Sequence, residues 1–309
     1  MANYITVDGG TTNTRVTLVL DGKVFATKKN SVGARAGIDG TTAQRTFIKD
    51  AIIELIDAAS IKESDIKKIL ASGMITSEFG LLKLDHIPAP AGVGELHDSM
   101  HEVVLSDISN IPFCFIRGVK LASESLNETD VMRGEETELA GLSPKANTVY
   151  VLPGSHSKII FTDDSGRIEK FYTMLTGEMI YALSQYTILK DAVDLSIKDI
   201  NEEYLLRGYR YASSEGLNEA LFKVRMLKNI FACDKVSLYS FFLGAVLSGE
   251  IQKMIRLNPE GFVIAGKEQI KLATYYILKS ESEAAITLVD ADEVDNSVVH
   301  GAIKIYECK

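Results

Sequence analysis

Hydrophobic and polar positions alternate along the first thirty residues in a way that is typical of strands. Residues 4–7 and 15–20 are rich in apolar and β-branched side chains, and the polar residues 8–14 separate them. The pair Asp21-Gly22 then favours a tight hairpin turn before a third strand-like segment, residues 23–29. The chain is therefore predicted to open with three consecutive strands.

A helical period of apolar residues follows the three strands. In residues 43–59 four apolar side chains fall on one face, which predicts an amphipathic helix. Residues 66–71 form a short apolar run that predicts another strand. Residues 81–94 are rich in proline, glycine and alanine and are predicted to be a loop.

The second half of the chain repeats the opening pattern. Strands are predicted at 148–152, 158–162 and 167–173, again with short polar connections. Helical spacing dominates the rest: helices are predicted at 177–189, 200–211, 217–231 and 236–256, strands at 261–265 and 286–289, and a helix at the end. The later helices carry apolar side chains that we expect in the core, namely Phe222, Leu227, Phe231, Phe241, Phe242 and Val246.

Length and composition indicate two globular domains. The chain has 309 residues, of which 46% are hydrophobic and 24% are charged, and single cores rarely grow beyond about 250–300 residues. Polar residues dominate around 121–129, where we place the boundary. The predicted domains are residues 1–122 and residues 123–309.

The net charge of −9 excludes one class of partner. A nucleic-acid partner is not expected because it would need a basic surface, whereas a small phosphorylated ligand needs only a locally positive pocket. No apolar run approaches the roughly 20 residues that span a bilayer, and the first residues lack the pattern of a secretory leader. The three cysteines are far apart and fit a reducing compartment. We therefore expect a cytoplasmic protein without a membrane partner.

The polar loop after the first strand carries the most chemical information. Its glycines let backbone amides approach an anion, and its hydroxyl and amide side chains add donors, which together make a phosphate cradle. The carboxylate at its start can hold Mg²⁺ close to the phosphates. A plain hairpin turn is the alternative, but the many hydroxyl groups and the strands that follow favour phosphate binding. The residues concerned are Asp8, Gly9, Gly10, Thr11, Thr12, Asn13 and Arg15.

A second loop has the same strand–loop–strand setting. Gly154, Ser155 and Ser157 supply amides and hydroxyls for phosphate oxygens. His156 or Lys158 could add positive charge at the transferring phosphate, although a histidine satisfied by the backbone is an equally good interpretation of His156. Two phosphate cradles are therefore predicted.

Phosphoryl transfer to a hydroxyl group also needs a carboxylate that orients and deprotonates the attacking oxygen. Asp130, Glu135 and Glu136 are the candidates, and Gly134 allows a sharp turn into a helix that begins there. Acidic residues are also common at an ordinary helix N-terminus. Arg133 is either a local ion-pair partner or a guanidinium fork for a substrate carboxylate.

Two further glycines follow predicted strands. The strand that ends at Gly266 suits the close approach of a nucleotide base to the backbone. Gly73 and Met74 could line the substrate side of a cleft, or they belong to an ordinary connecting loop.

Two phosphate loops on repeated units, followed by a strand that ends in glycine, resemble the layout of the ASKHA group, which contains actin, Hsp70 and sugar kinases. Within it, the chain resembles the 2-dehydro-3-deoxygalactonokinase family over most of its length. The segments that carry the resemblance are Val131-Met132-Arg133-Gly134-Glu135-Glu136-Thr137-Glu138-Leu139, Tyr150-Val151-Leu152-Pro153-Gly154-Ser155-His156-Ser157-Lys158 and Met174-Leu175-Thr176-Gly177-Glu178.

The resemblance implies a two-lobed α/β fold with mixed sheets flanked by helices and a central cleft that holds ATP and Mg²⁺. It implies ATP-dependent phosphorylation of 2-dehydro-3-deoxy-D-galactonate on its 6-hydroxyl. Glu135 matches the position of the base in related sugar kinases, with Glu136 next to it as an alternative and Asp130 as a rival. Asp8 would position Mg²⁺ and Lys158 would offset developing charge, while a homodimer is left open. The substrate side is assigned to Gly73, Met74, Arg133, Thr176 and Glu178.

The sequence departs from the family pattern in the expected nucleotide-base region. Lys267 and Glu268 follow Gly266 where the family has serine or threonine, and the glycine that usually precedes the acidic residue at Asp292 is missing. These departures leave open how adenine is held. The rival interpretations are an ASKHA kinase for another sugar or sugar acid, and an ATP-binding sensor without catalysis.

Overall fold

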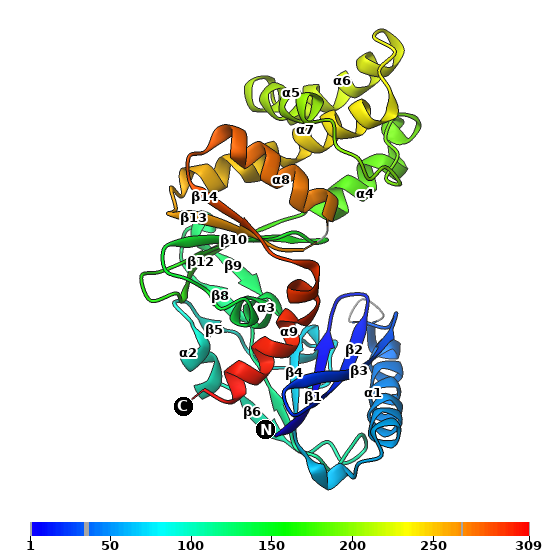
Figure 1. Cartoon of the computed structure of the whole chain (residues 1–309), viewed down its shortest axis with the longest axis vertical. Coiled ribbons are helices and arrows are strands. Elements are labelled where there is room, and N and C mark those ends of the chain that lie inside the picture. The colour runs from blue at the N-terminus through cyan, green and yellow to red at the C-terminus, as the bar shows by residue number, and fades with distance from the viewer. Residues whose placement is uncertain (1, 34–36, 267, 309) are drawn as a thin grey trace. The chain divides into compact units, whose positions relative to one another are not determined.

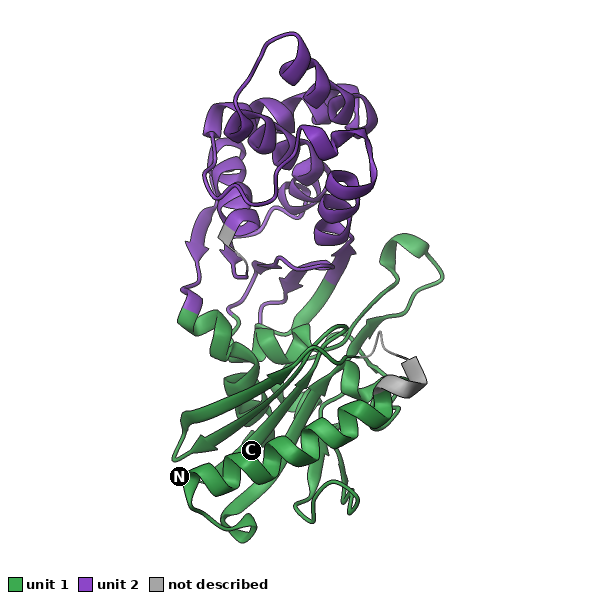
Figure 2. Cartoon of the chain, turned by 90° about the vertical axis from the view of Figure 1, so that its right-hand side faces the viewer, with its two compact units in different colours: residues 1–144, 166–170, 292–309 green, residues 145–165, 171–291 purple. Residues whose placement is uncertain are grey.

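The computed structural model describes residues 2–33, 37–266 and 268–308. The chain forms two compact units (Figure 2). Unit 1 contains Met1–Pro144, Gly166–Lys170 and Asp292–Lys309, and unit 2 contains Lys145–Ser165 and Phe171–Ala291. The units do not coincide with the predicted domains 1–122 and 123–309, because the chain beyond residue 122 continues in unit 1 and its last helix also belongs there.

Unit 1 is built on a six-stranded sheet in the order β3-β2-β1-β4-β7-β6 (Figure 1). Strand β1 pairs antiparallel with β2 and parallel with β4, so the carboxyl ends of β1 and β4 lie at the same edge. The strands are β1 (Asn3–Gly9), β2 (Thr14–Leu20), β3 (Lys23–Asn30), β4 (Ile66–Gly73), β6 (His101–Val103) and β7 (Phe113–Phe115). Asp21 and Gly22 both have positive φ, as expected for the predicted hairpin turn between β2 and β3.

The helix α1 (Gly37–Ala59) packs its apolar face on this sheet. Ile48, Ile52 and Leu55 are buried in one core with side chains of β1, β2 and β4. This confirms the helix predicted from the apolar period.

A smaller sheet and three more helices complete unit 1. The three strands β5 (Ile87–Pro88), β8 (Val119–Leu121) and β9 (Asp130–Met132) lie in the order β5-β8-β9. The helices are α2 (Val93–Asp98), α3 (Glu135–Gly141) and α9 (Ala291–Tyr306). A first side-chain carbon at Gly301 would lie 1.8 Å from the Thr137 carbonyl oxygen, so α9 packs directly on the α3 backbone.

Unit 2 repeats the strand pattern of unit 1. Its sheet has the order β12-β11-β10-β13-β14, with β10 antiparallel to β11 and parallel to β13. Its strands are β10 (Thr148–Leu152), β11 (Ser157–Thr162), β12 (Ile168–Met174), β13 (Gly261–Ile264) and β14 (Ala285–Leu288). The three strands predicted in this half are therefore confirmed, and they place the second loop between β10 and β11.

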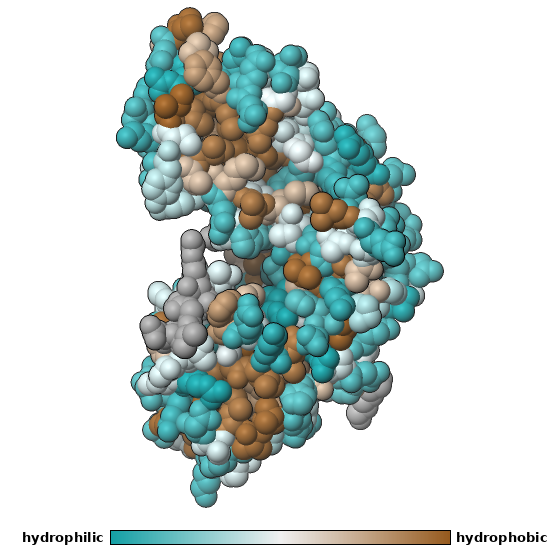
Figure 3. All heavy atoms as spheres, turned by 180° about the vertical axis from the view of Figure 1, so that it is seen from behind, coloured by the Kyte–Doolittle hydropathy of each residue, from teal (hydrophilic) through white to brown (hydrophobic). Residues whose placement is uncertain are grey.

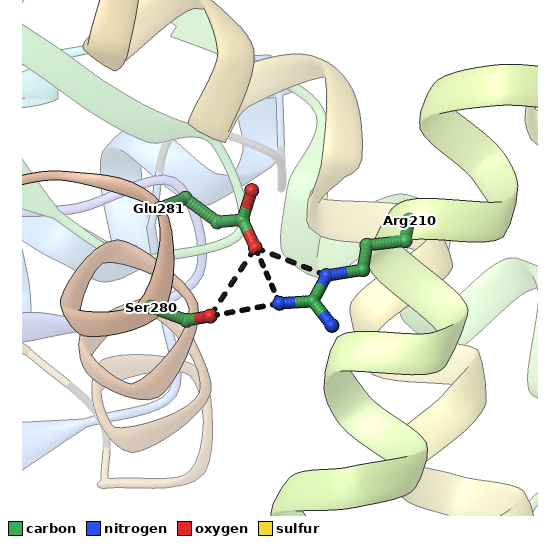
Figure 4. A network of polar contacts seen from close by, with 3 residues as sticks. All are labelled: Arg210, Ser280 and Glu281. Carbon is green, nitrogen blue, oxygen red and sulfur yellow. Dashed lines mark hydrogen bonds and ion pairs between the residues drawn. The ribbon is translucent and has the colours of Figure 1, made fainter.

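Helices cover the sheet of unit 2 around one long buried helix. The helices are α4 (Thr176–Tyr186), α5 (Glu202–Glu215), α6 (Leu217–Asn229), α7 (Lys235–Arg256) and α8 (Glu268–Glu281). Phe241, Phe242 and Leu243 of α7 are buried in a core shared with β10, β11 and β13. At the surface, Arg210 of α5 donates to Ser280 and Glu281 of α8 (Figure 4).

The core prediction fails at two positions. Phe222 and Phe231 are 52% and 63% exposed, because they lie on the outer side of α6 and just beyond its end. Leu227, Phe241, Phe242 and Val246 are buried as predicted. Apolar side chains are visible on the surface of both units in the face shown in Figure 3. No helix in the described ranges is long and apolar enough to cross a membrane.

Candidate functional site

The first loop is a tight turn that presents hydroxyl groups to solvent. It connects β1 to β2, and the Gly10 backbone N–H donates to the Asn13 carbonyl oxygen at 2.8 Å. The Asn13 side-chain amide donates to the Thr12 hydroxyl at 2.8 Å. Thr11 and Thr12 are exposed. The loop therefore has the donors that a phosphate cradle needs, already arranged by its own hydrogen bonds.

Buried contacts support this loop from behind. The Thr14 hydroxyl donates to the Val32 carbonyl oxygen at 2.7 Å and accepts from the side-chain amide of Gln44 at 2.9 Å. A first side-chain carbon at Gly33 would lie 2.6 Å from the Gly10 carbonyl oxygen, so the chain after β3 packs directly against the loop. The sequence pattern gave no signal for Gln44, which reaches the loop from α1.

Asp8 lies at the end of β1, opposite Arg15 of β2. Removal from water raises the pKa of its carboxyl, Arg15 lowers it and Glu135 raises it further. Next to Asp8 a cavity of about 340 Å³ opens between the sheet and α9. Its lining combines threonine hydroxyls with charged groups, namely Thr6, Asp8, Arg15, Thr17, Thr27, Lys29, Asp295 and Asn296, besides Val298 and Val299.

A close approach of two glycines brings the start of α3 to Asp8. Gly73 ends β4 with φ of 81°, and Gly134 precedes α3 with φ of 115°. A first side-chain carbon at Gly134 would lie 3.2 Å from the Gly73 Cα, and one at Gly73 would lie 3.4 Å from an Asp8 carboxylate oxygen. Because both φ values are in the left-handed region, larger residues here would be strained. Glu135 follows Gly134 at once and acts electrostatically on Asp8.

The three predicted bases occupy different surroundings. Glu136 is 1% exposed, and its two carboxylate oxygens accept from the Gly134 N–H at 2.9 and 2.8 Å and from the Thr137 hydroxyl at 3.0 Å. Asp130 begins β9 in the smaller sheet, and its carboxylate accepts from the Val131 N–H at 2.7 Å. Glu135 accepts from the Arg133 N–H at 3.1 Å, and of the three it alone acts on Asp8 among the described interactions.

A third carboxylate on α3 was missed by sequence reasoning. Glu138 is one turn beyond Glu135, and burial raises its pKa to about 8, with Glu135 and Asp8 raising it further and Arg15 lowering it. Burial likewise raises the pKa of Glu136 to about 7. The i, i+3 spacing from Glu135 could have predicted that Glu138 shares its face of the helix.

Arg133 is bound within unit 1 by several hydrogen bonds. One terminal nitrogen donates to the Thr76 carbonyl oxygen at 2.7 Å and to the Thr76 hydroxyl at 2.5 Å. The other donates to the Leu84 carbonyl oxygen at 3.1 Å and lies 3.3 Å from His86 Nδ1. Burial and the Arg133 charge lower the pKa of His86 to about 4, which keeps the ring neutral. The guanidinium therefore joins β9 to the chain after β4, where Met74 is half-buried.

The second loop is held by the first turn of α4. The N–H groups of Gly177 and Glu178 donate to the carbonyl oxygens of Gly154 and Ser155, both at 3.1 Å. A first side-chain carbon at Gly177 would lie 2.4 Å from the Gly154 carbonyl oxygen, so only glycine permits this approach. The segment Thr176-Gly177-Glu178 and the loop thus form one local structure, although more than twenty residues separate them.

The charged residues of the second loop differ in exposure. His156 Nε2 lies 3.4 Å from a carboxylate oxygen of Glu178, and both side chains are partly exposed. Ser157 and Lys158 are buried in β11, with Lys158 opposite Leu152. Gly266 follows β13 and packs on Pro153 at the start of the loop. Lys267 lies outside the described residues.

The residues around Asp8 fit a magnesium ion held mainly by phosphate and water. Glu135 raises the proton affinity of Asp8, and both residues raise that of Glu138, with Arg15 as the opposing charge. A divalent cation would relieve this excess of negative charge. No set of three or more His, Cys, Asp or Glu side chains forms a metal cage in the described ranges, and Mg²⁺ commonly uses only one or two carboxylates.

Comparison with known proteins points to one family. The sequence profile of 2-keto-3-deoxy-galactonokinase matches residues 8–303. A Rhizobium meliloti (strain 1021) protein named as a probable 2-dehydro-3-deoxygalactonokinase is 30% identical over 196 residues, which are 62% of this chain and 59% of that protein. The match thus spans less than two thirds of that relative. The 2-dehydro-3-deoxygalactonokinase of Escherichia coli (strain K12) is 24% identical over 255 residues, 82% of this chain and 80% of that protein.

A solved structure supports the same fold. A Sinorhizobium meliloti protein, provisionally assigned as a 2-dehydro-3-deoxygalactonokinase, superposes with a TM-score of 0.78 at 21% identity, over 99% of this chain and 100% of that one. The α/β fold of the ASKHA group predicted from the sequence is confirmed by both sheet orders and by this likeness. With the profile matching nearly the whole sequence, the chain belongs to the 2-keto-3-deoxy-galactonokinase family.

Proposed function

We propose that the protein phosphorylates 2-dehydro-3-deoxy-D-galactonate on its 6-hydroxyl, with ATP as the phosphoryl donor. Family membership supports the reaction class and the substrate. The observation that carries the proposal is the position of Glu135, which the Gly73–Gly134 contact places beside Asp8 at the first phosphate loop. A base and a phosphate-binding loop are the two parts that this transfer needs.

Glu135 is the proposed base among the three carboxylates. It would accept the proton of the 6-hydroxyl as the oxygen attacks the γ-phosphorus of ATP and the bond to the β-phosphate oxygen breaks. Glu136 is less suited because it is buried and both of its oxygens accept from the N–H of Gly134, just before its own helix. Asp130 belongs to the smaller sheet, five residues before Glu135.

Each unit is proposed to contribute one phosphate loop. Backbone amides and hydroxyls of Gly9–Asn13 and of Gly154–Ser157 would bind phosphate oxygens, and Lys158 would offset charge as the transfer proceeds. Asp8 would hold Mg²⁺, which when bound neutralises phosphate charge. Gly266, next to the second loop, remains the proposed approach for the nucleotide base.

The substrate side is proposed to include Gly73, which ends β4 next to Asp8, and Met74, which follows it. Thr176 and Glu178 are proposed on the side of unit 2. Arg133 donates to Thr76, Leu84 and His86 through both terminal nitrogens. We therefore propose that it holds the segment after β4 in place on the substrate side. Binding of a substrate carboxylate by its guanidinium would require some of these hydrogen bonds to break. A cytoplasmic location is also proposed, supported by three free cysteines.

A substrate panel tests the function. Purified protein with Mg-ATP is assayed against 2-dehydro-3-deoxygalactonate, other 3-deoxy-2-keto acids and plain hexoses. We expect the highest kcat/KM for 2-dehydro-3-deoxygalactonate, and Glu135→Gln to lower kcat by about 10²–10⁴-fold while nucleotide binding persists. A higher kcat/KM for another sugar would show that this sugar, and not 2-dehydro-3-deoxygalactonate, is the substrate. ATP binding without turnover of any compound would identify an ATP-binding sensor.

A further inference from the structure

A buried carboxylate lies in the helical core of unit 2. Glu250 is in α7 and is only 5% exposed, and its neighbours Leu247, Ile251 and Met254 are core residues. Its carboxylate accepts a hydrogen bond from the Thr176 hydroxyl at 2.6 Å. Burial raises the pKa of Glu250 to about 7, and only the Thr176 hydrogen bond opposes this effect.

Thr176 connects this carboxylate to the second phosphate loop. It is the first residue of α4, and the next two N–H groups donate to the carbonyl oxygens of Gly154 and Ser155. A continuous path of short contacts therefore runs from the middle of α7, through one threonine hydroxyl, to the backbone of the loop. Moving Thr176 would move the α4 turn that holds Gly154.

Stability alone gives no reason for a carboxylate at this position. Burying an ionisable group without an opposite charge is unfavourable, and apolar replacements of buried polar groups are often neutral or stabilising. The nearby charges have other partners: the Lys253 ammonium lies 3.7 Å from the centre of the Tyr172 ring, and Glu178 lies beside His156. A role in placing Thr176 explains why an acceptor is present in an otherwise apolar core.

We propose that Glu250 is a positioning residue for ATP binding, which fixes the second phosphate loop through Thr176 and the first turn of α4. The proposal rests on the proposed kinase function only in taking ATP as the ligand of this loop. Because the Thr176 hydroxyl donates its hydrogen bond to Glu250, it can only accept a hydrogen bond from a ligand. Thr176 thus acts first as a link and not as a donor to substrate.

The test measures nucleotide affinity and steady-state kinetics in the full-length protein. Glu250→Leu removes the acceptor, Thr176→Val removes the donor at nearly constant shape, and a double variant combines them. We expect each single change to raise the Kd for Mg-ATP about tenfold, as for loss of one charge-assisted hydrogen bond. The double variant should be no worse than the more affected single one, since both break the same link.

Controls separate positioning from general damage to the helix. Ser248→Ala removes a buried hydroxyl of α7 that bonds only locally, to the Ala245 carbonyl oxygen, and should leave the Kd for Mg-ATP within twofold of wild type. Glu250→Gln keeps an acceptor oxygen and should recover most of the lost affinity.

Two results would overturn the proposal. One is a wild-type Kd for Mg-ATP in folded Glu250→Leu, and the other is an equal loss in Ser248→Ala. If wild type binds Mg-ATP but phosphorylates no sugar acid, the proposed function fails while the affinity comparison still decides the role of Glu250. Circular dichroism of each variant verifies that it is folded.

Discussion

At the scale of single residues, two neighbouring glutamates on α3 are given opposite tasks by their hydrogen bonds. Glu136 is turned back onto the Gly134 N–H, where it satisfies the start of its own helix. Glu135 acts electrostatically on Asp8 and is the proposed base. The residue types alone could not decide which of the two is the base, because adjacent glutamates differ only in the direction of their side chains in the folded protein.

Replacing each glutamate by glutamine should separate these tasks. Glu135→Gln is expected to lower kcat by about 10²–10⁴-fold, the usual contribution of a general base. Glu136→Gln keeps an acceptor for Gly134 and should lower kcat far less, with a small loss of thermal stability. Steady-state kinetics with the sugar acid measure both effects. A larger loss of kcat in Glu136→Gln than in Glu135→Gln would show that Glu135 is not the base.

The titration of Glu250 should appear in the pH dependence of stability. Its pKa is about 7 in the folded protein against an ordinary value of 4.5. The folded protein thus keeps a proton that the unfolded chain releases, and stability falls as pH rises from 4.5 to 7 and then levels off. The contribution is on the order of 3 kcal/mol.

Glu250→Gln removes this titration. We expect the free energy of unfolding of the variant, relative to that of wild type, to be higher at pH 8 than at pH 5. Urea denaturation at both pH values measures this difference. The same difference between wild type and variant at both pH values would show that Glu250 is not perturbed as described.

At the scale of elements, the contact between α4 and the second loop depends on Gly177. Gly177→Ala would place a carbon 2.4 Å from the Gly154 carbonyl oxygen, so the loop must shift and the KM for ATP should rise at least tenfold. Gly249→Ala on α7 is the matched control, since nothing lies within 4 Å of the added carbon. It should stabilise the protein by up to about 1 kcal/mol through helix propensity. Unchanged KM for ATP in Gly177→Ala would remove this contact from nucleotide binding.

Regular elements were predicted well where apolar periodicity was strong. The strands at 148–152 and around β1 and β2, and the long helices α1 and α7, agree closely with the prediction because each buries one face or a continuous run. Strand β3 is largely exposed and followed from the Asp21-Gly22 turn. The short strands β5, β8 and β9 were not predicted. They lie in the segments interpreted as a loop, as the domain boundary and as the chain just before a helix. They have two or three residues each, too few for a period to be visible. Helix α8, between two predicted strands, was also missed.

The supports of the site were less predictable than its loops. Glycines and hydroxyls of both proposed phosphate loops are contiguous in sequence, so each loop could be predicted as a group. Gln44 contacts Thr14 at the first loop and Glu138 acts on Asp8, both from helices elsewhere in the chain. Glu250 contacts Thr176, beside the second loop. Their roles follow from tertiary contacts, which a single sequence does not record.

At the scale of the whole molecule, the net charge of −9 and the proposed polyanionic ligand are compatible because binding is local. Backbone amides and a cation can bind phosphate without a basic surface. Binding of Mg-ATP at about one hundred times its Kd should stabilise the protein by about 2.7 kcal/mol. This predicts a rise in Tm with ATP and Mg²⁺ together.

Asp8→Asn should remove the dependence of this rise on magnesium. The variant loses the carboxylate proposed to hold the ion, so ATP with and without Mg²⁺ should then give similar Tm values in thermal-shift experiments. If magnesium still enhances the effect of ATP in Asp8→Asn as strongly as in wild type, another group must hold the ion.

The most direct test of the account is identification of the product by ³¹P NMR. Wild-type protein, Mg-ATP and 2-dehydro-3-deoxy-D-galactonate should give ADP and a phosphomonoester coupled to the protons on carbon 6, with Glu135→Gln forming both about 10²–10⁴-fold more slowly. A phosphomonoester at another carbon, or full turnover by Glu135→Gln, would contradict the proposed reaction or its base.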